Sequence, residues 1–157
     1  MVATPSPQDN RGFFFLPQFY EGGGYYTHGT PENGVGQYAH PKMMTFLMMV
    51  AHRWCAVDDR KFGIGNISLA SGVPYPEHKS HRSGLEVDIR PLRKDGKRAL
   101  VYCTDKKNYD CEGTAKLIDI MWKTGMVKAI LFNDTKIPRV RPWVNHSHHF
   151  HVQLHSY

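Results

Sequence analysis

Two short stretches in which apolar and polar residues alternate constrain the fold of this chain most strongly. Residues 85–90 (LEVDIR) alternate apolar with charged side chains, and residues 149–154 (HFHVQL) alternate polar with apolar ones. A period of two is typical of a β-strand that buries one face and exposes the other. Asp88 is therefore expected on the polar face of one strand, and His149 and His151 on a shared face of another.

The remaining elements are expected from hydrophobic periodicity and from the residues that end helices and strands. Residues 43–57 are apolar on almost every side and follow Pro41, which predicts a buried helix. A second helix is expected at 114–124, where an apolar stripe runs up to Gly125. Further strands are expected at 64–69, 127–132 and 150–154. The class predicted is α+β, with a small, mostly antiparallel sheet and flanking helices.

Length and composition predict one soluble globular domain over residues 1–157. A chain of 157 residues with 41% hydrophobic residues can bury one continuous core without the help of disulfides. Residues 1–40 differ from the rest because they are rich in Gly, Pro, Tyr and Phe and contain strong turn signals. We expect them to form an irregular arm packed on the core.

The net charge of +6 and the pI near 9.3 favour polyanionic partners, among them nucleic acid, anionic membranes and anionic cell walls. Charge alone does not choose among these partners. The chain has no run of five or more Lys and Arg residues, so a solvated basic surface accounts for the charge equally well.

The cysteines and the N-terminus give expectations about the compartment. Cys103 and Cys111 bracket a short polar segment and are expected to form a disulfide in an oxidising compartment, while Cys55 is expected to be a buried core thiol. No signal peptide or membrane span is readable at the N-terminus. If the substrate lies outside the cytoplasm, we expect a leader that has been removed or delivery by other machinery.

The ten histidines carry most of the chemical information, through their placement more than their number. Isolated histidines are usually structural or solvated, and this interpretation is given to His28, His40, His52 and His155. Four others lie within six residues: His146, His148, His149 and His151. A cluster this dense is destabilised by protonation and stabilised by a cation.

A zinc site is the arrangement that these histidines favour together with Asp88. His81 lies seven residues before Asp88, in the loop that enters the same strand, where Gly84 allows the turn. Catalytic zinc sites use neutral imidazoles and a carboxylate as three protein ligands and leave a fourth position open for water. Spacing alone does not decide between His149 and His151 as the third ligand.

These segments resemble those of a known family. Residues 80–88 (SHRSGLEVD) and 149–151 (HFH) resemble the two zinc motifs of the LAS metallopeptidases. The similarity is greater to the penicillin-insensitive murein endopeptidases. It extends to a preceding Ile-x-x-Ser strand with a Gly-containing loop, here 64–74, and to an R-P-W element before the histidine cluster, here 141–143. The resemblance covers roughly residues 36–154.

The resemblance implies a LAS-like core and a zinc-dependent endopeptidase of peptidoglycan. It implies zinc ligands at His81, Asp88 and His151, with His149 and His146 as catalytic histidines. The implied substrate is the D-alanyl–meso-diaminopimelyl amide of the cross-link, and the implied location is the periplasm or the cell wall outside the producing cell. Neither nucleic acid nor membrane is expected as a partner. A secreted antibacterial effector or a lysin is compatible with this interpretation, and an effector requires an immunity protein in its producer.

Two other functions fit parts of the sequence. A metal-dependent nuclease fits the basic charge and the Asn145–His146 pair, although phosphate chemistry favours more carboxylates around the ion. A non-catalytic, zinc-containing cell-wall-binding module is the second alternative, because the hedgehog N-terminal domain resembles the same fold. His78 and His148 are expected to support the site or to be exposed. Arg90 and Arg141 are candidates for substrate carboxylates, with surface charge as the equal alternative.

Overall fold

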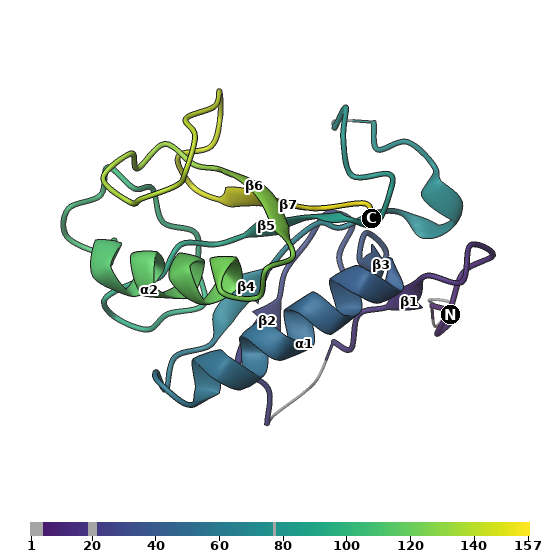
Figure 1. The fold of residues 1–157 in the computed structure, drawn as a ribbon, viewed down its shortest axis with the longest axis horizontal. Coiled ribbons are helices and arrows are strands. Elements are labelled where there is room, and N and C mark those ends of the chain that lie inside the picture. The colour runs from purple at the N-terminus through teal and green to yellow at the C-terminus, as the bar shows by residue number, and fades with distance from the viewer. Residues whose placement is uncertain (1–4, 19–21, 77) are drawn as a thin grey trace.

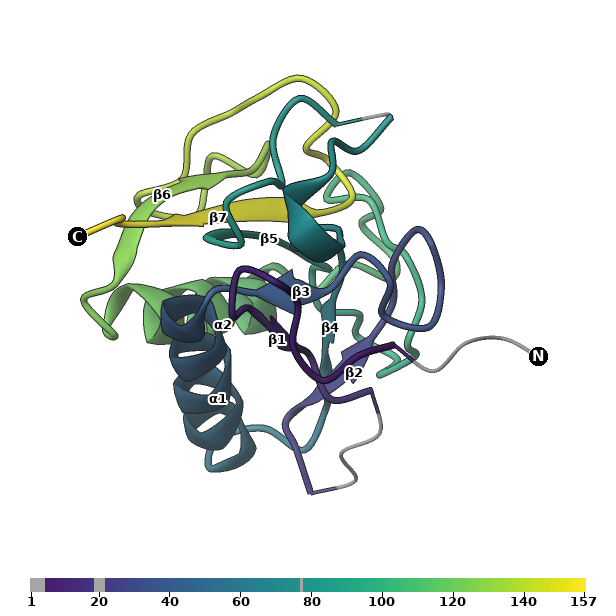
Figure 2. The same ribbon diagram turned by 90° about the vertical axis from the view of Figure 1, so that its right-hand side faces the viewer.

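The computed structural model of the protein describes residues 5–18, 22–76 and 78–157. Five strands form a sheet in the order β2-β4-β5-β7-β6, and two more form a small second sheet, β1-β3. Both helices cover one face of the larger sheet, and the long loops at 65–76, 78–84 and 132–149 lie beyond its other face (Figures 1 and 2). In chain order the elements are β1 (Phe14–Phe15), β2 (Tyr25–Thr27), β3 (Tyr38–Ala39), α1 (Pro41–Cys55), β4 (Phe62–Ile64), a 3₁₀ turn (Ala70–Gly72), β5 (Glu86–Ile89), α2 (Cys111–Trp122), β6 (Val127–Leu131) and β7 (Phe150–Leu154).

The predicted α+β class is confirmed, and the sheet is mixed. The pair β2-β4 is parallel, while β4-β5, β5-β7 and β6-β7 are antiparallel. The parallel strand comes from residues 1–40, which were expected to form an irregular arm packed on the core and which contain the three short strands β1, β2 and β3. The strand predicted at 64–69 is also displaced, because β4 ends at Ile64.

Helix α1 packs through one stripe only, and this corrects the prediction of an all-round buried helix. Its buried side chains are Met43, Phe46, Leu47, Val50, Ala51 and Trp54. Cys55, expected in the core, is exposed. The helix begins where His40 Nδ1 accepts a hydrogen bond from the Lys42 amide, with Pro41 in the first turn. His40 therefore has the structural role expected of it.

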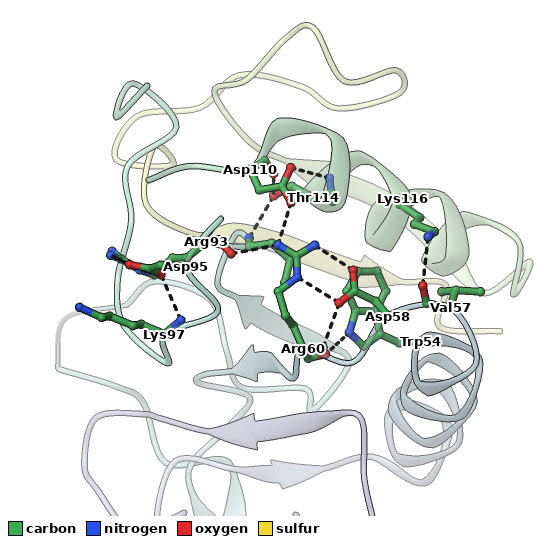
Figure 3. A network of polar contacts seen from close by, with 12 residues as sticks. Trp54, Val57, Asp58, Arg60, Arg93, Asp95, Lys97, Asp110, Thr114 and Lys116 are labelled. Atoms are coloured by element: carbon green, nitrogen blue, oxygen red, sulfur yellow. Dashed lines mark hydrogen bonds and ion pairs between the residues drawn. The ribbon is translucent and has the colours of Figure 1, made fainter. Parts of the chain in front are cut away.

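Helix α2 is fixed to α1 by a network of charged groups (Figure 3). Asp110 caps α2 by accepting a hydrogen bond from the Gly113 amide. The Arg60 guanidinium lies between Asp110 and Asp58, at 2.7 and 2.8 Å, and also donates to the Arg93 carbonyl. Because Asp58 lies three residues after the end of α1, this network holds the end of one helix against the start of the other.

The predicted Cys103–Cys111 disulfide is not formed, and all three cysteines are free thiols. The segment between them is held by a buried carboxylate instead. Asp134 accepts hydrogen bonds from the Tyr109 hydroxyl at 2.6 Å and from the Cys111 thiol at 3.2 Å. Burial and the neighbouring carboxylate raise the pKa of Cys111, so the protonated thiol that makes this contact is favoured.

None of the helices in the described part of the chain is long and apolar enough to cross a membrane.

Candidate metal and catalytic site

Strands β5 and β7 bring residues that lie 63 positions apart into contact. Their antiparallel register sets Asp88 opposite His151. His151 Nδ1 lies 2.9 Å from Asp88 Oδ1, and His81 Nε2 lies 3.2 Å from Asp88 Oδ2. All three residues are buried. One carboxylate thus lies between two imidazoles, which come from a loop and from the neighbouring strand.

The loop holds His81 in a conformation that few side chains adopt. Its φ angle is 65°, in the left-handed region that costs most residues roughly 1–2 kcal/mol. The His81 amide donates to Glu86 Oε2 at 2.8 Å, which helps to hold this geometry. Gly84 makes the turn, as expected. Its φ is also positive, and a β-carbon there would lie 2.7 Å from the His40 amide nitrogen.

Contacts on the far side of each ring orient the two imidazoles. His81 Nδ1 lies 3.1 Å from the Ile67 carbonyl oxygen, so this nitrogen carries the proton and donates it. Nε2 faces Asp88, where it donates to the carboxylate when the ring is charged and offers a lone pair to a metal ion when the ring is neutral. On the other ring, His151 Nε2 lies 3.7 Å from Glu86 Oε1 while Nδ1 faces Asp88. Partners of this kind fix the tautomer and the direction of metal-binding histidines.

The electrostatics of the cluster favour an ionised Asp88. Burial opposes the charge, but hydrogen bonds from His151 and His81 hold the pKa of Asp88 well below its ordinary value. Burial likewise opposes the imidazolium of His151, yet Asp88 and Glu86 raise the pKa of this ring to about 9. In the absence of an ion, a proton on His151 thus offsets the buried carboxylate.

The donor atoms fit a zinc ion. Two ligand atoms that are each ~2.1 Å from a tetrahedral ion lie about 3.4 Å apart. The separation between His81 Nε2 and Asp88 Oδ2 is 3.2 Å, so these two atoms already have nearly the spacing that zinc requires. Two nitrogens and one carboxylate also form a ligand set typical of zinc.

His78, not His151, completes the one group of three donor atoms in the described residues that lie close enough together to hold a metal ion. One donor atom from each of His78, His81 and Asp88 lies within 4.8 Å of the others. His78 belongs to a loop and is half-buried, and its Nε2 lies 3.4 Å from the Asn66 side-chain nitrogen. His151 is held more firmly, because it is buried on a central strand with both ring nitrogens facing carboxylates. His78, expected only to support the site, is thus close enough to compete with His151.

His149 and His146 lie beside this cluster. His149 Nε2 is 3.9 Å from Asp88 Oδ1, and the ring centroids of His146 and His149 are 4.6 Å apart. Burial is the main cause that lowers the pKa of His149 to about 4, so its ring is neutral near pH 7. A neutral ring has a nitrogen available to accept a proton. His148, the other neighbour, has its Nδ1 3.1 Å from that of His149.

A cavity of about 240 Å³ opens next to the cluster, with Asp88 and His149 in its wall. The wall also contains His28, which follows β2, and Arg90, which follows β5. The sequence predicts a structural or solvated role for His28, and for Arg90 it allows both binding of a substrate carboxylate and a surface charge. The alternation over 85–90 was the one available signal for Arg90, because it put Arg90 on the face of Asp88. Arg141, the other candidate, is exposed and pairs through its backbone with Leu131.

Comparison with known proteins gives matches to one family. Residues 21–118 match the family described as penicillin-insensitive murein endopeptidase. This match includes His81 and Asp88 and ends before the histidine cluster. A protein of Haemophilus influenzae named penicillin-insensitive murein endopeptidase is 27% identical over 146 residues, which cover 74% of this chain and 51% of that protein. The chain thus spans about half the length of this relative.

Proposed function

Because this chain belongs to the penicillin-insensitive murein endopeptidase family, we propose that it is a zinc-dependent endopeptidase that hydrolyses the peptide cross-links of bacterial peptidoglycan. The observation that carries the proposal is the convergence of His81 and His151 on the buried carboxylate of Asp88, at the wall of an open cavity. The basic charge of the chain also suits an anionic cell wall.

The proposed ligands are His81 through Nε2, Asp88 through its carboxylate and His151 through Nδ1. Each imidazole uses the nitrogen that faces Asp88, while its other nitrogen faces a carbonyl or carboxylate oxygen. His78 is the competing third ligand, and we favour His151 because β7 holds it in register with Asp88. When bound, zinc supplies a Lewis acid for the scissile carbonyl and for the attacking water.

His149 is proposed as the general base. Its Nε2 lies beside Asp88 without pairing closely with it, so a water positioned at the ligands is within reach of this ring. His149 accepts the proton of that water and returns it to the leaving amine. His146 stacks next to His149, with its Nδ1 2.7 Å from the Val144 carbonyl, and keeps the base in place. The loop that carries His146 is itself held in place. The Asn133 side-chain amide donates to the Ser147 hydroxyl, and the Cys103 backbone amide donates to the Ser147 carbonyl.

The bond proposed is the amide between D-alanine and meso-diaminopimelate. The location proposed is the periplasm or an external cell wall, reached by export, by phage lysis or by delivery as an effector. In the last case the producing cell needs an immunity protein.

We expect purified protein to convert cross-linked muropeptide dimers into monomers, a conversion that a chelator abolishes and saturating penicillin leaves intact. β-Lactams acylate an activated serine, and the sequence contains neither S-x-x-K nor G-x-S-x-G to supply one. Mass spectrometry of digested sacculi measures the products. Restoring activity with zinc after chelation is the control. Cut sugar chains, or stem peptides released from the glycan, would show that the enzyme cleaves a different bond of peptidoglycan. Cleavage of plasmid DNA in a parallel reaction, without cleavage of the dimers, would contradict the proposed function.

A further inference from the structure

Arg90 is placed on the same side of the sheet as the proposed metal ligands. It follows β5 directly and lies two residues beyond Asp88, and a strand repeats its direction every second residue. Its backbone amide donates to the Gly63 carbonyl at 3.0 Å, which continues the extended conformation. The Arg90 side chain lines the same cavity as Asp88 and His149.

Arg90 differs in its partners from the other half-buried arginines of the described residues, Arg11, Arg60 and Arg93. Four arginines form ion pairs with aspartates: Arg11 with Asp9, Arg60 with Asp58 and Asp110, Arg93 with Asp95, and Arg139 with Asp119. Among the residues that the structure describes, no hydrogen bond or ion pair joins the half-buried Arg90 guanidinium to a protein group. An anion that pairs with a guanidinium partly withdrawn from water gains more than one at an exposed guanidinium, because solvent competes less for the hydrogen bonds.

The rest of the cavity wall also lacks an anion for Arg90. Asp88 is the one carboxylate among the described lining residues, and it faces His81 and His151. His28 lines the same cavity and is near enough to Arg90 for the guanidinium to contribute to its lowered pKa, after burial, and its buried Nε2 has no hydrogen-bond partner. Gly65 makes room for this ring, since a β-carbon there would lie 2.8 Å from His28 Cε1. The cavity wall therefore contains an unpaired cation beside the proposed zinc ligands.

The size of the cavity fits one amino-acid residue of a substrate. Its volume of about 240 Å³ is below the roughly 300–1,000 Å³ of sites that enclose drug-sized ligands. In the cross-link named above, the carbon that carries the scissile amide nitrogen also carries a free carboxylate of diaminopimelate. The carbon of this carboxylate is two bonds from the nitrogen, so it lies close to the cavity wall that contains Asp88 and Arg90 when the amide is bound at the proposed zinc ligands.

We propose that Arg90 binds the free carboxylate of the residue on the amine side of the scissile amide, and so selects cross-links in which that carboxylate is present. The planar guanidinium can donate two parallel hydrogen bonds to a carboxylate, and the His28 ring lies beside the same place. This assignment rests on the proposed endopeptidase function and adds the chemical feature that the site recognises.

The test compares two muropeptide dimers that differ only in this group, one with the free carboxylate and one with the carboxamide. Wild-type protein should cleave the free acid about 10- to 100-fold better in kcat/KM, which is the range for a hydrogen-bonded charge. Arg90→Gln should lose this preference through a higher KM for the free acid, with kcat and zinc content kept. Arg90→Lys keeps the charge without the planar fork and should retain part of the preference.

Arg141→Gln is the matched control, because it removes an exposed arginine near the histidine loop and should leave the preference unchanged. Calorimetric binding of the diaminopimelate-containing monomer gives a readout without turnover, and Arg90→Gln should weaken it by the same factor. Equal cleavage of both dimers by the wild type, or full preference in Arg90→Gln, would overturn the role of Arg90 and leave the endopeptidase function standing. Cleavage of neither dimer by the wild type would overturn both.

Discussion

Replacement of His81, Asp88 or His151 by alanine should each remove zinc and lower peptidoglycan cleavage by about 10³-fold or more, since Lewis-acid catalysis contributes several kcal/mol. The two imidazoles contact opposite oxygens of one carboxylate, so each variant removes one of three donors from a compact set. Asp88→Ala should have the largest effect, because it also leaves two buried histidines without their shared anion.

His78→Ala is the matched control for these three variants. It removes a histidine whose ring centroid is 5.2 Å from that of His81, and it leaves the proposed ligands intact. Elemental analysis of the purified variants should find about one zinc per chain in His78→Ala and little in the other three. Zinc retained by His151→Ala and lost from His78→Ala would instead assign the site to His78, His81 and Asp88.

His149→Ala should keep its zinc and lose cleavage by roughly 10²–10⁴-fold, the usual contribution of a general base. His149 Nε2 is 3.9 Å from Asp88 Oδ1, near enough to reach a water at the proposed ligands. The measurements are zinc content and the initial rate of dimer cleavage on the same sample.

His146→Ala should resemble His149→Ala with a smaller loss, because His146 acts by holding the neighbouring ring. If His149→Ala loses the metal while His151→Ala keeps it, the roles of the two strand histidines are reversed.

Local sequence patterns predicted the strands that carry the site, because those patterns reflect burial directly. The alternation over 85–90 and 149–154 placed Asp88 and His151 on polar faces, and the antiparallel pairing of β5 and β7 sets them opposite each other. Both helices were also found at nearly their observed positions. Tyr25–Thr27 was missed because three residues between turns carry little periodicity, and their strand depends on pairing with distant β4.

Features that depend on contacts between distant residues could not be predicted from local sequence patterns. Cys103 and Cys111 looked like a bridged pair because they bracket a short loop. The carboxylate that contacts Cys111 comes from Asp134, 23 residues further along the chain. His28 and Arg90 likewise line one cavity because β2 and β5 belong to the same sheet, and no local sequence pattern predicts that arrangement.

X-ray diffraction at the zinc edge, from crystals of the zinc-loaded protein, tests the central claim most directly. The anomalous map should contain one strong peak per chain, about 2.0–2.2 Å from His81 Nε2, from an Asp88 oxygen and from His151 Nδ1. His149 should lie outside bonding distance of that peak. A peak bonded to His78, His81 and Asp88 without His151, or a peak that does not touch Asp88, would contradict the account.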